Sequence, residues 1–252
     1  MMSLTGIFGM EPGASSRSSL DSAGADRTAE DIVALEEFLS YAKNPLSRSS
    51  TASRHSIKKN VLELTRWGSH HGNGLLITTN GYFLTCVHCV DPMPSWLRAV
   101  DYKGGKHKIV KICSLVMEDD LALAKIDLEG LAFGCRYRVQ ESETQSLGKS
   151  IEMYARWNKD LKLREGILKS PSSPRPVFAT GSSNMIHYYF DHASARLEVI
   201  GGDSGGAVLN RQGELLGLVC SGARFSSSYV ESDNIMRMVK SYVSKLKRGG
   251  LE

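Results

Sequence analysis

The sequence predicts an all-β protein built from antiparallel strands, with one helix near each end of the chain. From Asn60 onward, short runs of β-forming residues alternate with turn residues. Asn80-Gly81 separates two such runs and is a strong hairpin signal, because both residues tolerate positive φ. No helical periodicity interrupts the runs, which favours an antiparallel sandwich or barrel. The runs are Val61–Arg66, Gly74–Thr79, Tyr82–Thr85, Lys108–Leu115, Leu121–Ile126, Ser150–Ala155, Met185–Phe190, Ala207–Leu209 and Leu215–Cys220.

Length, composition and net charge together indicate an ordinary globular protein. A chain of 252 residues can bury one sizeable core, or two small ones closed into a single unit. Its 41% hydrophobic and 23% charged residues are ordinary for a globular protein, and a net charge of +4 is too mild to indicate nucleic-acid binding. No run of about 20 apolar residues is present, so we expect no membrane span.

The first 30 residues and the cysteines bear on the compartment. The start of the chain lacks the basic stretch and apolar segment of a signal peptide. The five cysteines are odd in number and widely spaced, which disfavours a disulfide framework. We therefore expect a cytoplasmic protein, or a periplasmic one if a targeting segment has been removed.

Residues 1–59 form a predicted N-terminal extension. Residues 1–27 are rich in Ser, Gly and Ala and are expected to be flexible. An amphipathic helix is expected over about 28–43, capped by Thr28 and ended by Asn44-Pro45. This helix lies against the main body or binds a regulatory partner. Its apolar stripe consists of Ile32, Leu35, Phe38, Leu39 and Ala42.

Two further segments complete the expected organisation. Residues 46–59 are rich in Ser, Arg and Lys, and are expected to be an exposed basic linker, with partner binding as the alternative. The main domain, 60–252, ends in a predicted helix over about 233–248. Cations late in that helix suit its negative dipole end. We expect it to dock on the barrel, with membrane binding as the alternative. Its apolar stripe consists of Ile235, Met238, Val239, Tyr242, Val243 and Leu246.

Ser204 is the candidate nucleophile. It lies in Gly202-Asp203-Ser204-Gly205-Gly206, a glycine-rich turn followed by a short strand. Acyl transfer by serine needs two backbone N–H groups that converge on the developing oxyanion. Glycines let the backbone adopt that shape, so Gly202 and Ser204 are the candidate oxyanion-hole donors. The alternative is a hairpin turn that happens to contain Asp and Ser.

His88 and Asp120 are the candidate partners of Ser204. His88 ends the apolar run that begins at Tyr82, where an imidazole can face a cleft and act as a general base. Asp120 directly precedes the run Leu121–Ile126, where a carboxylate needs a partner. The alternatives are a buried structural histidine and a solvated loop acid. The order His, Asp, Ser is that of chymotrypsin rather than of subtilisin or the α/β-hydrolases.

These motifs together resemble the trypsin/chymotrypsin-like serine peptidases, and most closely the high-temperature-requirement (Deg) proteases. The resemblance spans about residues 60–245. It implies two antiparallel six-stranded β-barrels with an active site between them and a C-terminal helix. It also implies hydrolysis of protein or peptide substrates through an acyl-enzyme, without metal or organic cofactor. The matching motifs are Gly72-x-Gly74, Gly81-Tyr82, Thr85-x-x-His88-x-Val90, Asp120-Leu-Ala, Gly202-x-Ser204-Gly-Gly-Ala and Gly213-Glu-Leu-Leu-Gly217.

The chain departs from the family pattern in ways that bear on regulation. Cys89 has no obvious disulfide partner. No Ile-Val-Gly-Gly-type N-terminus stands ahead of Val61, so insertion of a freed terminus beside Asp203 is not expected. Only a helix follows the catalytic domain, so the peptide-binding PDZ module of Deg proteases is not expected either.

Three residues are candidates for the substrate pocket by the same resemblance. Glu198 aligns with the pocket floor of trypsin-like enzymes and would favour Lys or Arg side chains, or else it faces solvent. Gly222 would permit a side chain to enter. Cys220 replaces a serine that contacts substrate backbone or the triad aspartate, and is a weaker hydrogen-bonding group there.

Two alternatives concern chemistry and control. Cys86-Val-His-Cys89 has the spacing of a zinc pair, but Cys113, Cys135 and Cys220 are isolated in the sequence, so no metal site is expected. The alternative to an active endopeptidase is a latent or inactive module on the same fold. Such a module would bind or regulate, under the control of a partner or of processing within 46–59.

Overall fold

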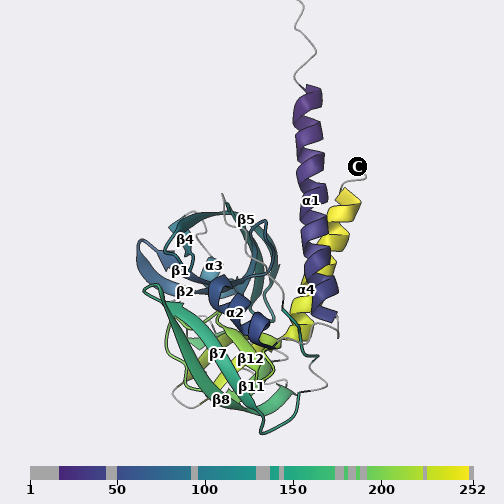
Figure 1. The fold of residues 1–252 in the computed structure, drawn as a ribbon. Coiled ribbons are helices and arrows are strands. Elements are labelled where there is room, and N and C mark those ends of the chain that lie inside the picture. Colours follow the sequence, from purple (N-terminus) through teal and green to yellow (C-terminus); the bar gives the residue numbers. More distant parts are fainter. Residues whose placement is uncertain are drawn as a thin grey trace, which may run out of the picture.

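The first barrel is a closed antiparallel sheet in the order β1-β2-β3-β6-β5-β4 (Figure 1). Strand β3 is buried along its whole length, and β6 exposes part of only one side chain, that of Lys125. This explains their continuous apolar sequences, because both faces of each strand are covered. The strands are β1 (Val61–Arg66), β2 (Ser69–Leu76), β3 (Tyr82–Cys86), β4 (Leu97–Val100), β5 (Lys106–Val116) and β6 (Leu121–Ile126).

The hairpin expected at Asn80-Gly81 is confirmed, since β2 and β3 pair in antiparallel fashion on either side of it. Gly81 has a φ of +100°, and a Cβ there would lie 2.3 Å from the carbonyl oxygen of Ile126. Only glycine fits this turn.

The second barrel closes in the order β11-β14-β13-β12-β7-β8. Its longest hairpin joins β7 to β8 through Asn158 and Lys159, whose φ angles of 50° and 70° match the two-residue turns that suit twisted strands. The strands are β7 (Ser150–Trp157), β8 (Asp160–Ser173), β11 (His192–Arg196), β12 (Ala207–Asn210), β13 (Leu215–Ala223) and β14 (Ser226–Glu231). The expectation of two six-stranded barrels is therefore confirmed.

The structure describes most, but not all, of the chain. The described residues are 17–43, 50–91, 96–128, 137–141, 145–173, 179–180, 186–187, 192–223 and 226–249. The strand expected at Met185–Phe190 is represented within them by β10 (Ile186–His187), which pairs with β9 (Ala179–Thr180) in a separate two-stranded sheet.

Helix α1 (Arg17–Lys43) stands beside the barrels and packs along α4 (Ser232–Gly249) (Figure 1). Its expected apolar stripe is the contacting face, since Leu35, Phe38 and Ala42 are buried. The helix begins well before Thr28, so the expectation of flexibility is wrong for residues 17–27. The physical reason is that the helix extends N-terminally through residues without an apolar period, so the sequence carries no helical signal there.

Helix α2 (Ser50–Asn60) corrects the expectation of an exposed linker over 46–59. Ile57 is fully buried, and Arg54 forms an ion pair of 2.8 Å with Glu152 on the second barrel. The segment was expected to be exposed because it is rich in basic residues, but the one large apolar side chain among them, Ile57, packs into the core. The part at 46–49 lies outside the described residues.

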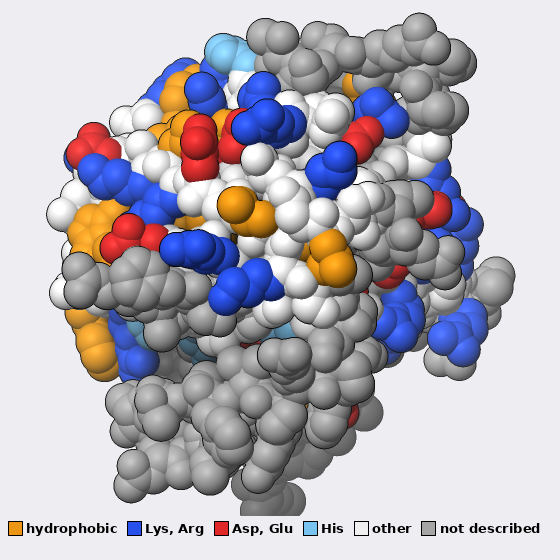
Figure 2. Space-filling view, turned by 90° about the horizontal axis from the view of Figure 1, so that it is seen from below, with side chains coloured by type: hydrophobic (Ala, Val, Ile, Leu, Met, Phe, Trp, Pro, Cys, Tyr) orange, Lys and Arg blue, Asp and Glu red, His pale blue; other side chains and the backbone are white. Residues whose placement is uncertain are grey.

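Helix α4 confirms the C-terminal prediction to within one residue at each end. Five stripe residues are buried, namely Ile235, Met238, Val239, Tyr242 and Val243. Within the described part of the chain, no helix combines the length and the apolar character needed to cross a membrane. Viewed from below, basic side chains are interspersed with acidic and apolar ones (Figure 2).

Candidate active site

His88 is held by a single turn of helix at the end of a buried strand. Strand β3 leads directly into α3 (Val87–Val90), where Val87, Cys89 and Val90 are buried. These three apolar contacts orient the turn, and the Val87 N–H donates to the carbonyl of Asp120 at 3.0 Å. The His88 side chain is left 37% exposed, so it is the one member of the turn that faces outward.

Asp120 lies in the turn between β5 and β6 and fixes the orientation of His88. Its φ of +50° is unusual for a residue other than glycine, although Asp adopts it more readily than most. One carboxylate oxygen accepts the backbone N–H of His88 at 3.0 Å, and the other pairs with His88 Nδ1 at 2.6 Å. Nδ1 therefore carries the proton, and Nε2 remains available to accept one.

The surroundings of His88 raise its pKa. Burial on its own lowers this pKa, but the neighbouring Cys89 and the hydrogen bond to Asp120 outweigh that effect. Cys89 responds in the opposite direction, because a hydrogen bond from Cys86 and the nearby His88 lower the pKa of its thiol against the effect of burial.

Ser204 lies between β11 and β12, and its backbone is tied to the first barrel. Its carbonyl accepts the N–H of Asn73 at 2.7 Å. Its hydroxyl donates to the carbonyl of Cys220 at 3.2 Å. Although Ser204 and His88 are both described residues, no hydrogen bond joins them. The structure thus brings His88 and Asp120 together and leaves the serine hydroxyl turned toward β13.

The four residues before Ser204 form a tight turn. The N–H of Asp203 donates to the carbonyl of Ile200 at 3.1 Å, which places Gly202 at the third position of the turn. Gly202 has a φ of +97°, as a type II turn requires at that position. A Cβ on Gly202 would lie 2.4 Å from His70 Cδ2, so only glycine fits.

His70 is a contributor to this site that sequence reasoning missed. Its Nε2 lies 2.9 Å from the carbonyl of Gly202, and its Nδ1 lies 3.1 Å from a carboxylate oxygen of Glu63. The ring also stacks on Trp157 at 4.3 Å. The side-chain amide of Asn73 donates to the same Gly202 carbonyl at 2.8 Å. The available signal was His70-His71 directly ahead of the glycine-rich Gly72–Gly74.

Asp203 and Arg164 form a buried ion pair that sequence reasoning also missed. The Arg164 guanidinium, on β8, donates to the carboxylate of Asp203 and to the carbonyl of Glu198, the latter at 3.2 Å. The N–H of Ile200 donates to the same carboxylate at 2.7 Å. Burial raises the pKa of Asp203, while Ile200 and Arg164 oppose that rise.

The three candidate pocket residues have different environments. Glu198 and Gly222 are exposed. The backbone carbonyl of Glu198 accepts a hydrogen bond from Arg164. Cys220 is buried. Its thiol donates to the carbonyl of Leu218 and accepts from the thiol of Cys86, and its own carbonyl accepts from the Ser204 hydroxyl.

Cys220 is isolated in sequence but not in space. Its sulfur lies 3.7 Å from that of Cys86, and both are free thiols. Cys86, Asp120 and Cys220 hold their potential ligand atoms within 4.8 Å of one another, as do Cys86, His88 and Cys89. The spacing and soft sulfur donors suit a thiophilic cation, but the first set also contains the carboxylate that holds His88. The prediction of no metal overlooked this clustering.

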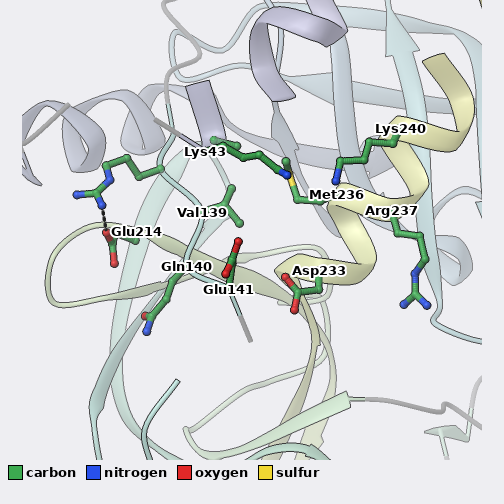
Figure 3. A pocket seen from close by; sticks show the side chains of 11 residues that line it. Lys43, Val139, Gln140, Glu141, Glu214, Asp233, Met236, Arg237 and Lys240 are labelled. Carbon is green, nitrogen blue, oxygen red and sulfur yellow. Dashed lines mark ion pairs between the residues drawn. The ribbon is translucent and has the colours of Figure 1, made fainter. Parts of the chain in front are cut away.

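A separate cavity of about 780 Å³ lies where α1 and α4 meet the 137–141 segment (Figure 3). Arg138 and Glu214 form an ion pair of 2.9 Å at its edge. His88, Asp120 and Ser204 are not among its lining residues, so it is distinct from the candidate active site. The lining residues are Ala42, Lys43, Arg138, Val139, Gln140, Glu141, Glu214, Asp233, Met236, Arg237 and Lys240.

Solved structures show the same fold. An HtrA-type protease, AlgW with decapeptide, is 15% identical with a TM-score of 0.61, covering 78% of this chain and 68% of that one. A Deg5 crystal structure is 17% identical with a TM-score of 0.60, covering 79% of this chain and 96% of that one. Identities this low establish the shared fold and nothing further.

A curated relative and a family model provide the sequence evidence. The relative is a "probable membrane transporter protein MamO" of Paramagnetospirillum magneticum (strain ATCC 700264 / AMB-1). It is 25% identical over 169 residues, which cover 65% of this chain and 25% of the relative, so the chain spans about a quarter of the relative's length. The model of the trypsin-like peptidase domain matches residues 72–218, more than half of the chain. The chain therefore belongs to the trypsin-like peptidase family.

Proposed function

We propose that this chain is a serine endopeptidase that hydrolyses protein substrates through an acyl-enzyme. The observation that carries the proposal is the 2.6 Å contact between His88 Nδ1 and Asp120, which leaves Nε2 as the proton acceptor. The family match supports it. HtrA-type protease structures with a decapeptide and with a tripeptide support a peptide as the ligand class.

The proposed reaction uses three side chains and two backbone donors. Ser204 Oγ attacks the scissile carbonyl carbon while its proton passes to His88 Nε2. The resulting oxyanion is stabilised by the N–H groups of Gly202 and Ser204. His88 then returns the proton to the leaving amine, and water hydrolyses the acyl-enzyme with His88 again acting as the base. Asp120 stabilises the imidazolium at each stage.

The reaction requires the Ser204 hydroxyl to leave the carbonyl of Cys220 and turn toward His88. A serine hydroxyl changes direction by rotation about χ1 between staggered states, and catalytic hydrogen bonds often tighten only when substrate binds.

A fluorophosphonate probe tests the assignment directly. We expect it to label the native chain once, at Ser204, and not to label Ser204→Ala. Ser221→Ala is the matched control, because that serine lies on β13, one residue after Cys220, and its hydroxyl is hydrogen-bonded to that of Ser228. Labelling that persists in Ser204→Ala would refute the nucleophile.

A latent or purely binding module is the second candidate, and the bond from Ser204 to the Cys220 carbonyl favours it. A protein locked in this state would bind peptides without cleaving them. A peptide library scored for both cleavage and retention separates the two functions, since retention without cleavage supports the binding module.

The specificity proposal is that Glu198, Cys220 and Gly222 shape the substrate pocket, with Glu198 favouring Lys or Arg. Glu198→Gln is then expected to reduce cleavage after basic residues relative to cleavage after apolar ones. An unchanged ratio in a library cleavage profile would remove Glu198 from the pocket.

A further inference from the structure

Two cysteines of different barrels meet beside Asp120. Cys86 ends β3 of the first barrel, and Cys220 lies on β13 of the second. Both are free thiols, and their sulfur atoms are 3.7 Å apart. Both residues are buried, with exposed fractions of 0% and 2%. The proposed acyl-transfer reaction uses neither thiol, so this pair is available for other chemistry.

The separation of the two sulfur atoms is that of two thiolates bound to one metal ion. Cysteine sulfur binds zinc at about 2.3 Å, and a tetrahedral ion then holds two such sulfurs about 3.8 Å apart. The observed 3.7 Å matches this value, so the two strands already hold the sulfurs at the right spacing. A disulfide would instead require the sulfurs to approach to about 2.05 Å.

Asp120 supplies a third ligand. Its carboxylate offers an oxygen that lies, with the sulfurs of Cys86 and Cys220, in a group whose members are all within 4.8 Å of one another. Three protein ligands leave one tetrahedral position for a water molecule. Two sulfur donors favour a thiophilic cation such as Zn²⁺ or Cd²⁺ over Mg²⁺ and Ca²⁺, which prefer oxygen ligands.

Binding of such a cation leaves no uncompensated charge among the sulfurs. Each thiol gives up its proton when it binds, so two thiolates neutralise one divalent cation and two protons are released. A buried charge is costly unless a partner compensates it, and here the ligands themselves do so.

A second group of possible ligands shares Cys86 with the first. Cys86, His88 and Cys89 also hold their ligand atoms within 4.8 Å of one another. The thiol of Cys89, however, is directed at the carbonyl of Ser204, at 3.9 Å. Because Cys86 belongs to both groups, variants of Cys220 and of Cys89 distinguish them.

We propose that Cys86, Cys220 and Asp120 form an inhibitory site for a thiophilic divalent cation of the zinc or cadmium kind. The inhibition rests on the proposed peptidase function, whereas the binding does not. A cation on the Asp120 carboxylate competes with His88 for the same oxygens, and it repels the imidazolium that forms during proton transfer. The bound ion also joins the two barrels, because its sulfur ligands come from one strand of each.

A cadmium titration tests the binding, monitored through the ultraviolet thiolate-to-cadmium charge-transfer band. The full chain is used with Cys113 and Cys135 replaced by alanine, so that thiols outside the two groups give no signal. We expect one Cd²⁺ per chain. Cys220→Ala should weaken binding at least about 100-fold, because loss of a second-shell partner alone costs about 10- to 100-fold. Cys89→Ala is the matched control and should leave the affinity almost unchanged.

Two further measurements keep the test independent of activity. Asp120→Asn should weaken Cd²⁺ binding while the charge-transfer band of the bound form persists, because both thiolates remain. Cd²⁺ should raise the Tm of the native chain and of Cys89→Ala, since an ion that binds only the folded state stabilises it, but not the Tm of Cys220→Ala. If Cys220→Ala does not fold, Cys220→Ser, which keeps the size of the side chain, replaces it.

Inhibition is measured as the ratio of kcat/KM with and without Cd²⁺, so that each variant is its own reference. In the native chain this ratio should fall at least about 100-fold, towards the roughly 10⁴-fold loss typical of a disabled triad aspartate, and EDTA should restore it. In Cys220→Ala the ratio should stay close to one at the same Cd²⁺ concentration.

Three results would overturn the proposal. The first is the absence of a charge-transfer band in the native chain. The second is a band that survives in Cys220→Ala but is lost in Cys89→Ala, which would place the ion in the other group. The third is binding without inhibition, which would remove the inhibitory role. If the metal-free native protein cleaves no substrate, the peptidase function fails, and the titration alone decides for or against the site.

Discussion

The two barrels each contribute one buried aspartate to this site, and the two carboxylates have different kinds of partner. Asp120 of the first barrel is bonded to an imidazole, that of His88. Asp203 of the second barrel is bonded to a guanidinium, that of Arg164. An imidazole changes charge near neutral pH, whereas a guanidinium does not. In the proposed reaction the first barrel therefore supplies the group that transfers protons, whereas the second barrel contains an ion pair of fixed charge beside Ser204.

The largest effect is expected from breaking the first pair. Asp120→Asn leaves an amide that can donate to Nδ1, which favours the wrong tautomer of His88. We expect kcat to fall by about 10⁴-fold, the loss typical of this change in a Ser-His-Asp triad. Steady-state kinetics at pH 8 measure it, and Asp119→Asn in the same turn is the control. A loss below tenfold would separate Asp120 from catalysis.

A smaller loss is expected from disturbing the turn of the second barrel while both carboxylate pairs stay intact. Gly202→Ala places a Cβ 2.4 Å from His70 at a φ of +97°. We expect kcat to fall by about 10²- to 10³-fold as the donor is displaced. Gly201→Ala, whose Cβ meets nothing within 4 Å, should lose far less. Equal losses in both variants would argue against the assigned oxyanion donor.

A third experiment tests whether the pH dependence of kcat/KM arises from His88 in the first barrel. His88 acts as a base only when it is unprotonated, so its raised pKa shifts the acid limb of kcat/KM above the ordinary pH of about 6.5. Cys89→Ala removes the neighbour that most raises this pKa, so the limb should move to lower pH. Cys113→Ala should leave the limb in place. A limb that does not move in Cys89→Ala would show that Cys89 does not tune His88.

The smallest effect is expected from an ion pair outside both barrels. Lys247 on α4 and Glu36 on α1 lie 2.7 Å apart, with about half of each side chain exposed. Lys247→Ala should lower the free energy of unfolding by less than about 1 kcal/mol, as is usual for exposed pairs. Urea denaturation measures it, with Lys245→Ala as the control. A larger loss in Lys247→Ala would mean that this pair anchors α1 to α4.

The candidate triad was predictable because each member lies in a local motif. His88 ends an apolar strand, Asp120 starts one, and Ser204 lies in a glycine-rich turn. Strand pattern and helical stripes likewise depend on residues close together in the chain, which is why both barrels and α4 matched their expectations. The errors fell on residues 17–27 of α1, which form helix without an apolar period, and on α2, where Ile57 is a single buried apolar residue among charged neighbours.

Contacts between segments far apart in the chain were not predictable, because no sequence periodicity indicates them. His70 meets Gly202, Arg164 meets Asp203, and Cys86 meets Cys220, in each case between segments far apart in the chain. Only closure and docking of the barrels bring these side chains within reach. Local sequence thus determined which residues could act as nucleophile, base and orienting acid. The tertiary structure decided how the turn before Ser204 is anchored and where the Ser204 hydroxyl points. The first depends on His70 and Asn73 of the other barrel, and the second depends on Cys220 of β13 in the same barrel.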